Sequence, residues 1–448
     1  MADVTDGGGS SVDAGSSVDV VQLCADLIRF DTTNRGGGDS EGEREAAEYV
    51  AEFLGRHGVA AKIVESAPRR ANVIARIPGT DPALPALLVQ GHLDVVPADA
   101  SDWSVPPFSG EVRDGFLWGR GATDMKDFCA MVLAAVASGL RPRRELVLAF
   151  VADEEDKGDY GAHWLVERHP ELFEGCVAAI SESGAYSYHV PAADGRMVRL
   201  YPVGTAERGT AHLKLTARGR AGHGSRPNDE NAVTMLADAL HRITSHRWPV
   251  RLTPTVRAFL ERTGAALGVP VDLSSSEAVD DTVARLGPAG SLVVPTVRNS
   301  TTPTMLSAGY KVNVIPSTAT AQVDVRVLPG AEDELFEVLD SLLGPGVTRE
   351  FVAHQPPVQA PVDSPWFDAM AEALHGEDPD AVVVPYCLGG GTDAKAFAKL
   401  GMACYGFAPL SLPEGFPYRA MAHGVDERVP VEGLRFGTRV LKRFLESC

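Results

Sequence analysis

The feature that most constrains the fold is the alternation of short apolar runs with helix-like segments through the first half of the chain. Such alternation is typical of a mostly parallel sheet that carries helices on both faces. We therefore expect an α/β fold whose sheet is mixed but mostly parallel and is flanked by helices. Strands are predicted around residues 72–77, 86–90, 145–151 and 176–180, and helices around residues 20–30, 43–57, 125–138 and 162–168.

A different pattern begins near Thr205 and predicts a second, inserted domain. The predicted order there is strand, helix, strand, strand, helix, strand, which is the order of a ferredoxin-like α+β unit. These elements come from "TAHLKLTARG", the helix 231–243, "KVNVIPSTATAQVDVRVLPG", "EDELFEVLDSLL" and "VTREFVAH". After the insertion, the alternation of helix-like and strand-like segments resumes, with a helix at 366–374, a strand at 382–384 and a last helix at 431–445.

These patterns divide the chain into four parts. We predict a flexible tail at 1–18, a main domain formed by 19–204 and 357–448, and the inserted domain at 205–356. The segment 247–303 within the insertion is long and helix-like, and we expect it to shape the pocket or the edge of a dimer.

Composition excludes several classes of function. The net charge of −19 disfavours nucleic acid and anionic membranes as partners, because both require dense Lys/Arg surfaces. No apolar run approaches the roughly 18 residues of a membrane span. The first twenty residues lack the basic start and apolar middle of a secretion signal, so we expect a cytoplasmic protein. The six cysteines contain no C-x-x-C pair, which argues against a disulfide framework or a structural zinc site.

Polar residues gather where the predicted strands end. The run "LLVQGHLDVV" ends in His92 and Asp94, "LVLAFVADEED" places Glu154 and Glu155 after a strand, and "CVAAISESG" ends at Glu182. The carboxyl ends of parallel strands are where an open sheet binds its ligands, so these side chains are expected to converge.

Convergent histidine and carboxylate side chains indicate a site for zinc or a similar divalent ion. A two-metal site needs about three protein ligands for each ion, one bridging carboxylate and an open position for water. Asp124 in "GRGATDMKD" and His423 in "MAHGVDER" supply further ligands. Bound cations would also offset the repulsion among so many carboxylates.

With these motifs the sequence resembles the dinuclear zinc amidohydrolases that include acetylornithine deacetylase, succinyl-diaminopimelate desuccinylase, aminoacylase and glutamate carboxypeptidase. The resemblance runs from about Val20 to the C-terminus. It is carried, in the family's order, by "GHLDVVP", "GRGATDMKD", "ADEED", "SESG", "GRAGHGSRP", "NVIP", "DVRVLPG" and "AHGVDE".

The resemblance implies two metal ions for each chain, with zinc as the first choice and cobalt or manganese as alternatives. His92 and Glu182 would bind one ion, Glu155 and His423 the other, and Asp124 would bridge them. Glu154 would be the general base, and Asp94 would orient the His92 ring from behind. By contrast, we expect Asp153, Asp156 and Asp159 to be ordinary solvated loop residues.

The inserted domain corresponds, by the same resemblance, to a lid that forms a homodimer. His223 would reach the active site of the partner subunit and stabilise the tetrahedral intermediate. Asn313 and Arg326 would bind the scissile carbonyl region and the substrate carboxylate, for which the fork of an arginine is suited. Gly390 and Gly391, in "LGGGTDAKAF", would let the backbone approach the substrate.

The resulting prediction is a hydrolase that cleaves an amide next to a free carboxylate, acting on an N-acyl amino acid or a short peptide. A dizinc aminopeptidase and a non-catalytic dimeric binding protein of the same fold remain as alternatives. One departure from the family pattern is Asp127, which stands where many members carry glycine. This departure leaves the side-chain specificity open.

Overall fold

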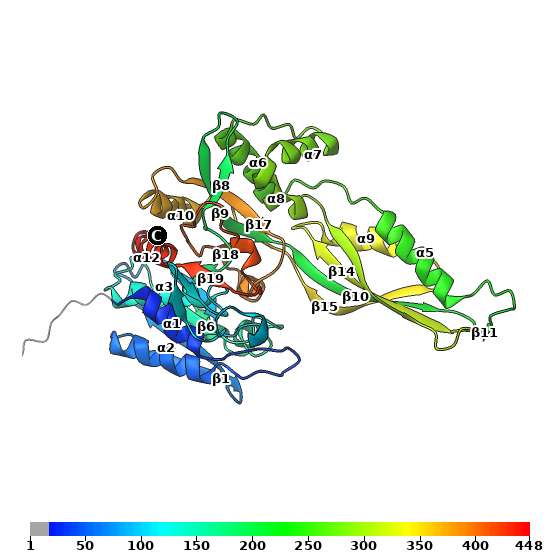
Figure 1. Ribbon diagram of the computed structural model, residues 1–448, viewed down its shortest axis with the longest axis horizontal. Coiled ribbons are helices and arrows are strands. Elements are labelled where there is room, and N and C mark those ends of the chain that lie inside the picture. Colours follow the sequence, from blue (N-terminus) through cyan, green and yellow to red (C-terminus); the bar gives the residue numbers. More distant parts are fainter. Residues whose placement is uncertain (1–17) are drawn as a thin grey trace, which may run out of the picture.

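The computed structural model describes residues 18–448 and consists of a main lobe and an elongated arm (Figure 1). The main lobe is built on a ten-stranded sheet in the order β1-β2-β6-β3-β7-β18-β9-β16, with β8 and β17 also paired to β9. Its centre, β6-β3-β7-β18, is parallel, whereas the pairs β1 with β2 and β2 with β6 are antiparallel. The strands are β1 (Ala61–Ala67), β2 (Arg70–Ile77), β3 (Ala86–His92), β6 (Leu146–Val151), β7 (Cys176–Ser181), β8 (Tyr188–Pro191), β9 (Met197–Glu207), β16 (Val358–Gln359), β17 (Val382–Leu388) and β18 (Ala403–Gly406).

Helices cover both faces of this sheet, because its central strands are apolar on both sides. Along β6, Leu146, Leu148 and Phe150 pack into one core, while Val147 and Val151 pack into another. The first core lies under α1 (Val20–Arg29), α2 (Arg44–Arg56), α3 (Lys126–Ala137), α10 (Pro365–His375) and α12 (Val431–Ser447), and the second under α4 (Ala162–Arg168) and α11 (Ala394–Phe397). The predicted mixed α/β sheet with flanking helices is confirmed.

The arm is a four-stranded antiparallel sheet in the order β12-β14-β10-β15. Side chains alternate between buried and half-buried along β14, and the buried face packs against two helices. The order of elements is that of the predicted ferredoxin-like unit, but the prediction placed both central strands in residues 311–330, whereas the first of them is β12 at 300–308. From the predicted strand region, Val314 and Ile315 instead form β13, which pairs with β11 in a short ribbon at the far tip (Figure 1). The bounds are β10 (Gly209–Arg218), β11 (Gly222–His223), α5 (Ala232–Ser245), β12 (Ser300–Ala308), β13 (Val314–Ile315), β14 (Thr318–Val327), α9 (Glu332–Leu343) and β15 (Val347–Gln355).

The helical segment within the arm's sequence packs elsewhere. Helices α6 (Pro254–Leu267), α7 (Ser276–Arg285) and α8 (Gly290–Val293) form a third core with β8, β9 and β17 of the large sheet (Figure 1). The predicted insertion 205–356 therefore contains a segment that belongs, by its packing, to the main lobe.

Three short strands complete the fold beside α3 and α12. They are β4 (Glu111–Arg113), β5 (Phe116–Trp118) and β19 (Arg428–Pro430). Residues 1–17, which hold nearly all of the predicted tail, lie outside the described residues. Between residues 18 and 448, no helix is both long and apolar enough to cross a membrane.

Candidate metal centre

The site lies at the carboxyl edge of three adjacent parallel strands. His92 is the last residue of β3, Glu154 and Glu155 follow β6, and Glu182 follows β7. Since these strands are neighbours, their carboxyl ends bring the three polar segments together as the sequence predicted. Asp124 approaches from the turn before α3.

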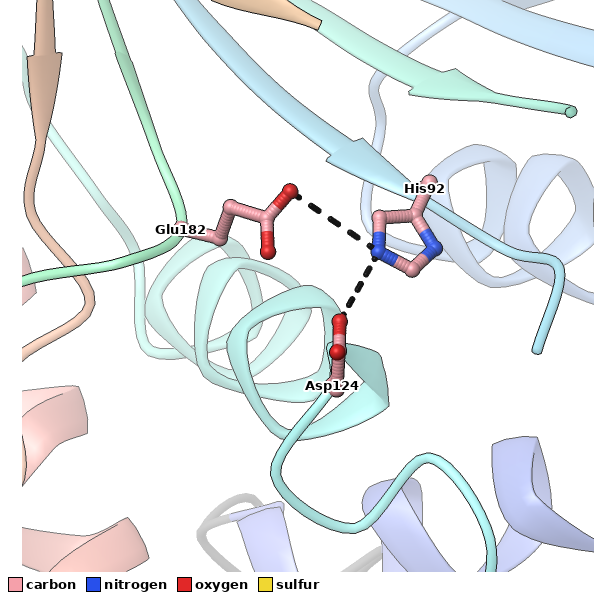
Figure 2. Close-up of side chains that lie close together, drawn as sticks. All are labelled: His92, Asp124 and Glu182. Carbon is pink, nitrogen blue, oxygen red and sulfur yellow. Dashed lines mark hydrogen bonds and ion pairs between the residues drawn. The ribbon is translucent and has the colours of Figure 1, made fainter. Parts of the chain in front are cut away.

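The first group of possible metal ligands contains His92, Asp124 and Glu182. Figure 2 shows the two carboxylates on either side of one edge of the imidazole ring. His92 is fully buried, and its Nε2 lies 3.1 Å from Asp124 Oδ1 and 3.9 Å from Glu182 Oε1. All three side chains therefore present a donor atom to one point.

The second group shares Asp124 and adds Glu155 and His423. His423 Nε2 lies 3.2 Å from Asp124 Oδ2 and 3.0 Å from Glu155 Oε2. The two oxygens of Asp124 thus face different groups. The structure brings the five residues together in the same two sets into which the resemblance divides them.

Glu154 belongs to neither group but stands beside the first, with its Oε2 3.9 Å from His92 Nε2. Asp94 fixes this arrangement from behind. Its carboxylate accepts hydrogen bonds from the backbone N–H groups of Glu154 and Glu155 at 3.1 and 3.2 Å. Nδ1 of His92 lies 3.0 Å from the Asp94 carbonyl oxygen and 3.6 Å from its carboxylate. Asp94 therefore holds the ring mainly through its backbone and the glutamate loop through its side chain.

Electrostatics in the protein alone are unfavourable to this many charges. Burial and neighbouring carboxylates raise the pKa of Glu154 and of Glu182 well above the usual range. Burial also opposes the charge of Asp124, but hydrogen bonds from His423 and His92 outweigh it and hold that pKa below its usual range. The same contacts with Asp124 and Glu155 raise the pKa of His423 to about 10.

One atom indicates what would relieve this imbalance. Glu182 Oε1 is buried and has no hydrogen-bond partner in the described chain. An unpartnered buried carboxylate oxygen is costly unless a cation binds it. Two three-donor groups of histidine and carboxylate that share one aspartate fit a pair of divalent ions.

The prediction that Asp153 is a solvated loop residue is wrong. Its side chain is 2% exposed and accepts hydrogen bonds from Arg70 at 2.7 Å and Asn34 at 3.0 Å. Arg70 also binds the buried Glu43, so one guanidinium neutralises two carboxylates behind the site. Asp156 is half-buried and Asp159 is exposed.

Glu427 is a positioning residue to which sequence reasoning gave no role, although it closes the motif "AHGVDE". It is fully buried and accepts hydrogen bonds from Gly121 N at 3.1 Å, Thr123 N at 2.7 Å and Arg120 Nη1 at 2.7 Å. Burial raises its pKa to about 7, against the effect of Arg120. These bonds hold the turn that carries Asp124.

Two predicted residues of the arm lie far from this centre. His223 is exposed on β11, at the arm tip in Figure 1, and its Nδ1 lies 2.9 Å from Ser225 Oγ. Asn313 is next to it, since Gly224 N donates to the Asn313 carbonyl at 3.0 Å. Within one chain, the structure does not bring either residue to the metal ligands.

The other predicted substrate-binding residues surround the base of the arm. Arg326 forks onto Asp324 at 2.8 and 3.1 Å and also donates to Thr210 Oγ1 at 2.9 Å. Gly390 lines a cavity beside the metal ligands. Gly391 packs so closely on a lysine that an added Cβ would lie 2.1 Å from Lys395 Nζ.

Two cations near these residues escaped prediction. Arg208 is 8% exposed and donates to the Gly389 carbonyl at 3.1 Å and to Ser300 Oγ at 3.2 Å. Lys395 is 1% exposed and reaches only neutral oxygens. Within residues 18–448, neither has a carboxylate oxygen within 4.0 Å. No local pattern marks either residue, because each acquires its surroundings from distant segments.

A family comparison decides what kind of protein carries this site. Residues 88–447 match the model of peptidase family M20/M25/M40. The chain belongs to this family. As a member of the M20/M25/M40 family it is a metal-dependent amidohydrolase, and the predicted resemblance is confirmed.

Similar proteins span nearly the whole chain. A probable carboxypeptidase S-like 2 of Dictyostelium discoideum is 27% identical over 94% of this chain and 83% of its own length. The aminoacylase-1 of Sus scrofa is 28% identical over 86% of this chain and 85% of its own length. An M20 family metallo-carboxypeptidase from Sulfolobus solfataricus has the same fold, with a TM-score of 0.69, 20% identity and coverage of 96% of this chain and 98% of that one.

Proposed function

We propose that the protein hydrolyses an amide bond next to a free carboxylate, in an N-acyl amino acid or a short peptide, with two divalent ions, most simply zinc. The observation that carries the proposal is the pair of three-donor groups that share Asp124, with Glu154 beside one of them. A shared carboxylate and an adjacent free carboxylate are what a two-metal hydrolase requires.

The geometry of the two groups supports the following ligand roles. His92 and Glu182 would hold one ion, Glu155 and His423 the other, with Asp124 between them. Bound divalent ions supply a water of lowered pKa and a Lewis acid that polarises a carbonyl group. Glu154 acts as general base and acid: its Oε2 takes the proton of the attacking water and delivers it to the leaving nitrogen.

Recognition of the substrate carboxylate belongs to the cations at the base of the arm. Arg208 and Lys395 are buried without a carboxylate partner in the described chain, whereas Arg326 is already paired with Asp324. A buried cation without a counter-ion is stabilised by an anionic ligand. We infer that Arg208 and Lys395 supply the positive charge that binds the substrate carboxylate, and that Arg326 shapes their surroundings.

We further infer a homodimer formed by the arms, in a reducing compartment such as the cytoplasm. Strand β12 is an edge strand, and it and the loop after it expose Met305, Leu306, Tyr310 and Val312. An exposed apolar edge is a site for pairing with another chain. In such a dimer His223 could reach the active site of the partner subunit. The reducing compartment is supported by the six cysteines, which are all free thiols.

Metal-loaded protein tested against N-acetyl and N-succinyl amino acids, dipeptides and the corresponding amino acid amides would check the proposal. We expect hydrolysis only where a carboxylate lies next to the scissile amide. Preferential cleavage of unblocked substrates without a carboxylate would instead identify an aminopeptidase. Absence of hydrolysis with every substrate, at full metal content, would support a binding protein.

A further inference from the structure

A cavity of about 270 Å³ opens beside the first metal-ligand group. Asp124 and Glu182 form one side of it, so its contents would lie next to the reacting atoms. Cavities of about 150 Å³ already accept a benzene ring, so this one can hold a complete amino acid side chain. The position and the size both suit a group attached to the scissile amide.

The wall of this cavity contains a buried carboxyl group that nothing in the site explains. Asp127, in the first turn of α3, is 1% exposed and lines the cavity. Its Oδ2 is buried and makes no hydrogen bond within residues 18–448. Burial raises the pKa of Asp127 to about 8, which expresses how poorly the unpaired charge is solvated. It stands three residues beyond Asp124 and belongs to neither ligand group.

Aromatic rings form much of the remaining wall. Phe128, Tyr186, Tyr386 and Tyr418 line the cavity, and the rings of Tyr186 and Tyr418 lie 4.6 Å apart. The three tyrosine hydroxyls make no hydrogen bond within the described chain. The faces and oxygens of such rings attract cations. Arg419 also lines the cavity at its exposed side, and its charge acts on Tyr186 and Tyr386, so a basic group would have to lie nearer to Asp127 than to Arg419.

We propose that this cavity is a specificity pocket for a basic group of the substrate, an ammonium or guanidinium whose charged end pairs with Asp127 and whose stem lies against the aromatic rings. The inference rests on the proposed function, whose substrate class it narrows. Asp127 acts here as a specificity residue and takes no part in the transfer of the proton.

Other occupants of the cavity would satisfy the Asp127 carboxyl group less well than a basic group would. An apolar side chain would fill the cavity and leave Asp127 Oδ2 buried without a hydrogen-bond partner, which is costly. An anionic group could meet only the protonated form of Asp127, and it would gain no attraction between opposite charges there. A basic group satisfies the carboxyl, and the gain from a charge-assisted hydrogen bond corresponds to roughly a tenfold to hundredfold change in binding.

Matched substrates that differ only in the basic end test this pocket. N-acetyl-lysine and N-acetyl-norleucine place the group on the amine side of the amide, and lysyl-glycine and norleucyl-glycine place it on the acyl side. In one of these pairs, the wild-type protein should prefer the lysine compound by about tenfold to a hundredfold in kcat/KM. In Asp127→Asn the preference should fall to near one, through a loss of about tenfold to a hundredfold in kcat/KM for the lysine compound. The control Asp102→Asn, an exposed aspartate, should change neither value.

The outcomes separate this inference from the function on which it rests. Failure to hydrolyse any substrate would overturn the proposed function, while calorimetric binding of N-acetyl-lysine over N-acetyl-norleucine would still support the pocket. Hydrolysis without a preference for the lysine compound in either pair would overturn the pocket alone. An Asp127→Asn protein that keeps the wild-type preference would do the same. So would a stronger preference of the wild-type protein for neutral tyrosine substrates than for the lysine compounds. If Asp127→Asn does not fold, the test is inhibition of the wild-type protein by n-butylamine compared with n-butanol. We expect the amine to inhibit more strongly, and inhibition no stronger than that by n-butanol would overturn the pocket.

Discussion

At the scale of single residues, adjacent glutamates are proposed to do different work. We expect Glu154→Gln to reduce turnover by about a hundredfold or more while the metal content stays that of the wild type, because Glu154 lies outside both ligand groups. Glu155→Gln should lower metal content and activity together. Metal analysis of the purified variants beside hydrolysis assays makes the comparison. Loss of an ion from Glu154→Gln would require the two roles to be exchanged.

Sequence reasoning found the residues that local patterns mark. His92 and Glu182 end apolar strands, and the parallel arrangement of those strands then brings them together. Asp153 also follows an apolar strand, but its burial was not predicted, because its partner Arg70 lies 83 residues away in the sequence. Glu427 escaped assignment for the same reason, since the turn that it holds lies about three hundred residues earlier. The local sequence around Asp153 or Glu427 does not indicate contacts with such distant segments.

At the scale of elements, the turn before α3 depends on Glu427. We expect Glu427→Gln to weaken metal binding by about tenfold to a hundredfold, because a neutral side chain pairs poorly with Arg120 and holds the Asp124 turn less firmly. Competition with a chelator measures the affinity. Glu432→Gln, an exposed glutamate of α12, is the matched control. Unchanged metal affinity in a folded Glu427→Gln protein would show that the turn holds its position without this charge.

The elements themselves were predictable where apolar runs are long and regular. The ferredoxin-like order and the central strands β3, β6 and β7 were confirmed, but β1, β8, β9, β12 and β18 were not predicted. Strand β9 contains Pro202, which weakens a strand pattern. Helices α6 to α8 were predicted as helical without a destination. The apolar residues of these helices do not indicate which of the two sheets the helices cover. The third core shows that they cover the ten-stranded sheet.

At the scale of the whole molecule, β11, which carries His223, lies at the tip of the arm, whereas the strands that end at the metal ligands lie in the main lobe (Figure 1). A dimer through the arms would allow His223 to complete the site of the partner subunit, which makes a prediction about mixed dimers. Neither His223→Ala nor Glu154→Gln homodimers should be active, since loss of an oxyanion donor costs roughly a hundredfold to a thousandfold in turnover. A mixed dimer, however, contains one site in which both groups are intact.

The experiment is to unfold and refold the two inactive variants together, establish heterodimers by mass, and measure hydrolysis. With free mixing, half the dimers carry one intact site, so activity should recover to about a quarter of wild type. The recovered signal would stand well above that of either parent, and remixing His223→Ala with wild-type protein calibrates the exchange of subunits. If proven heterodimers recover no activity, His223 serves its own subunit or no site at all, and the inference that it acts on the partner's site is wrong.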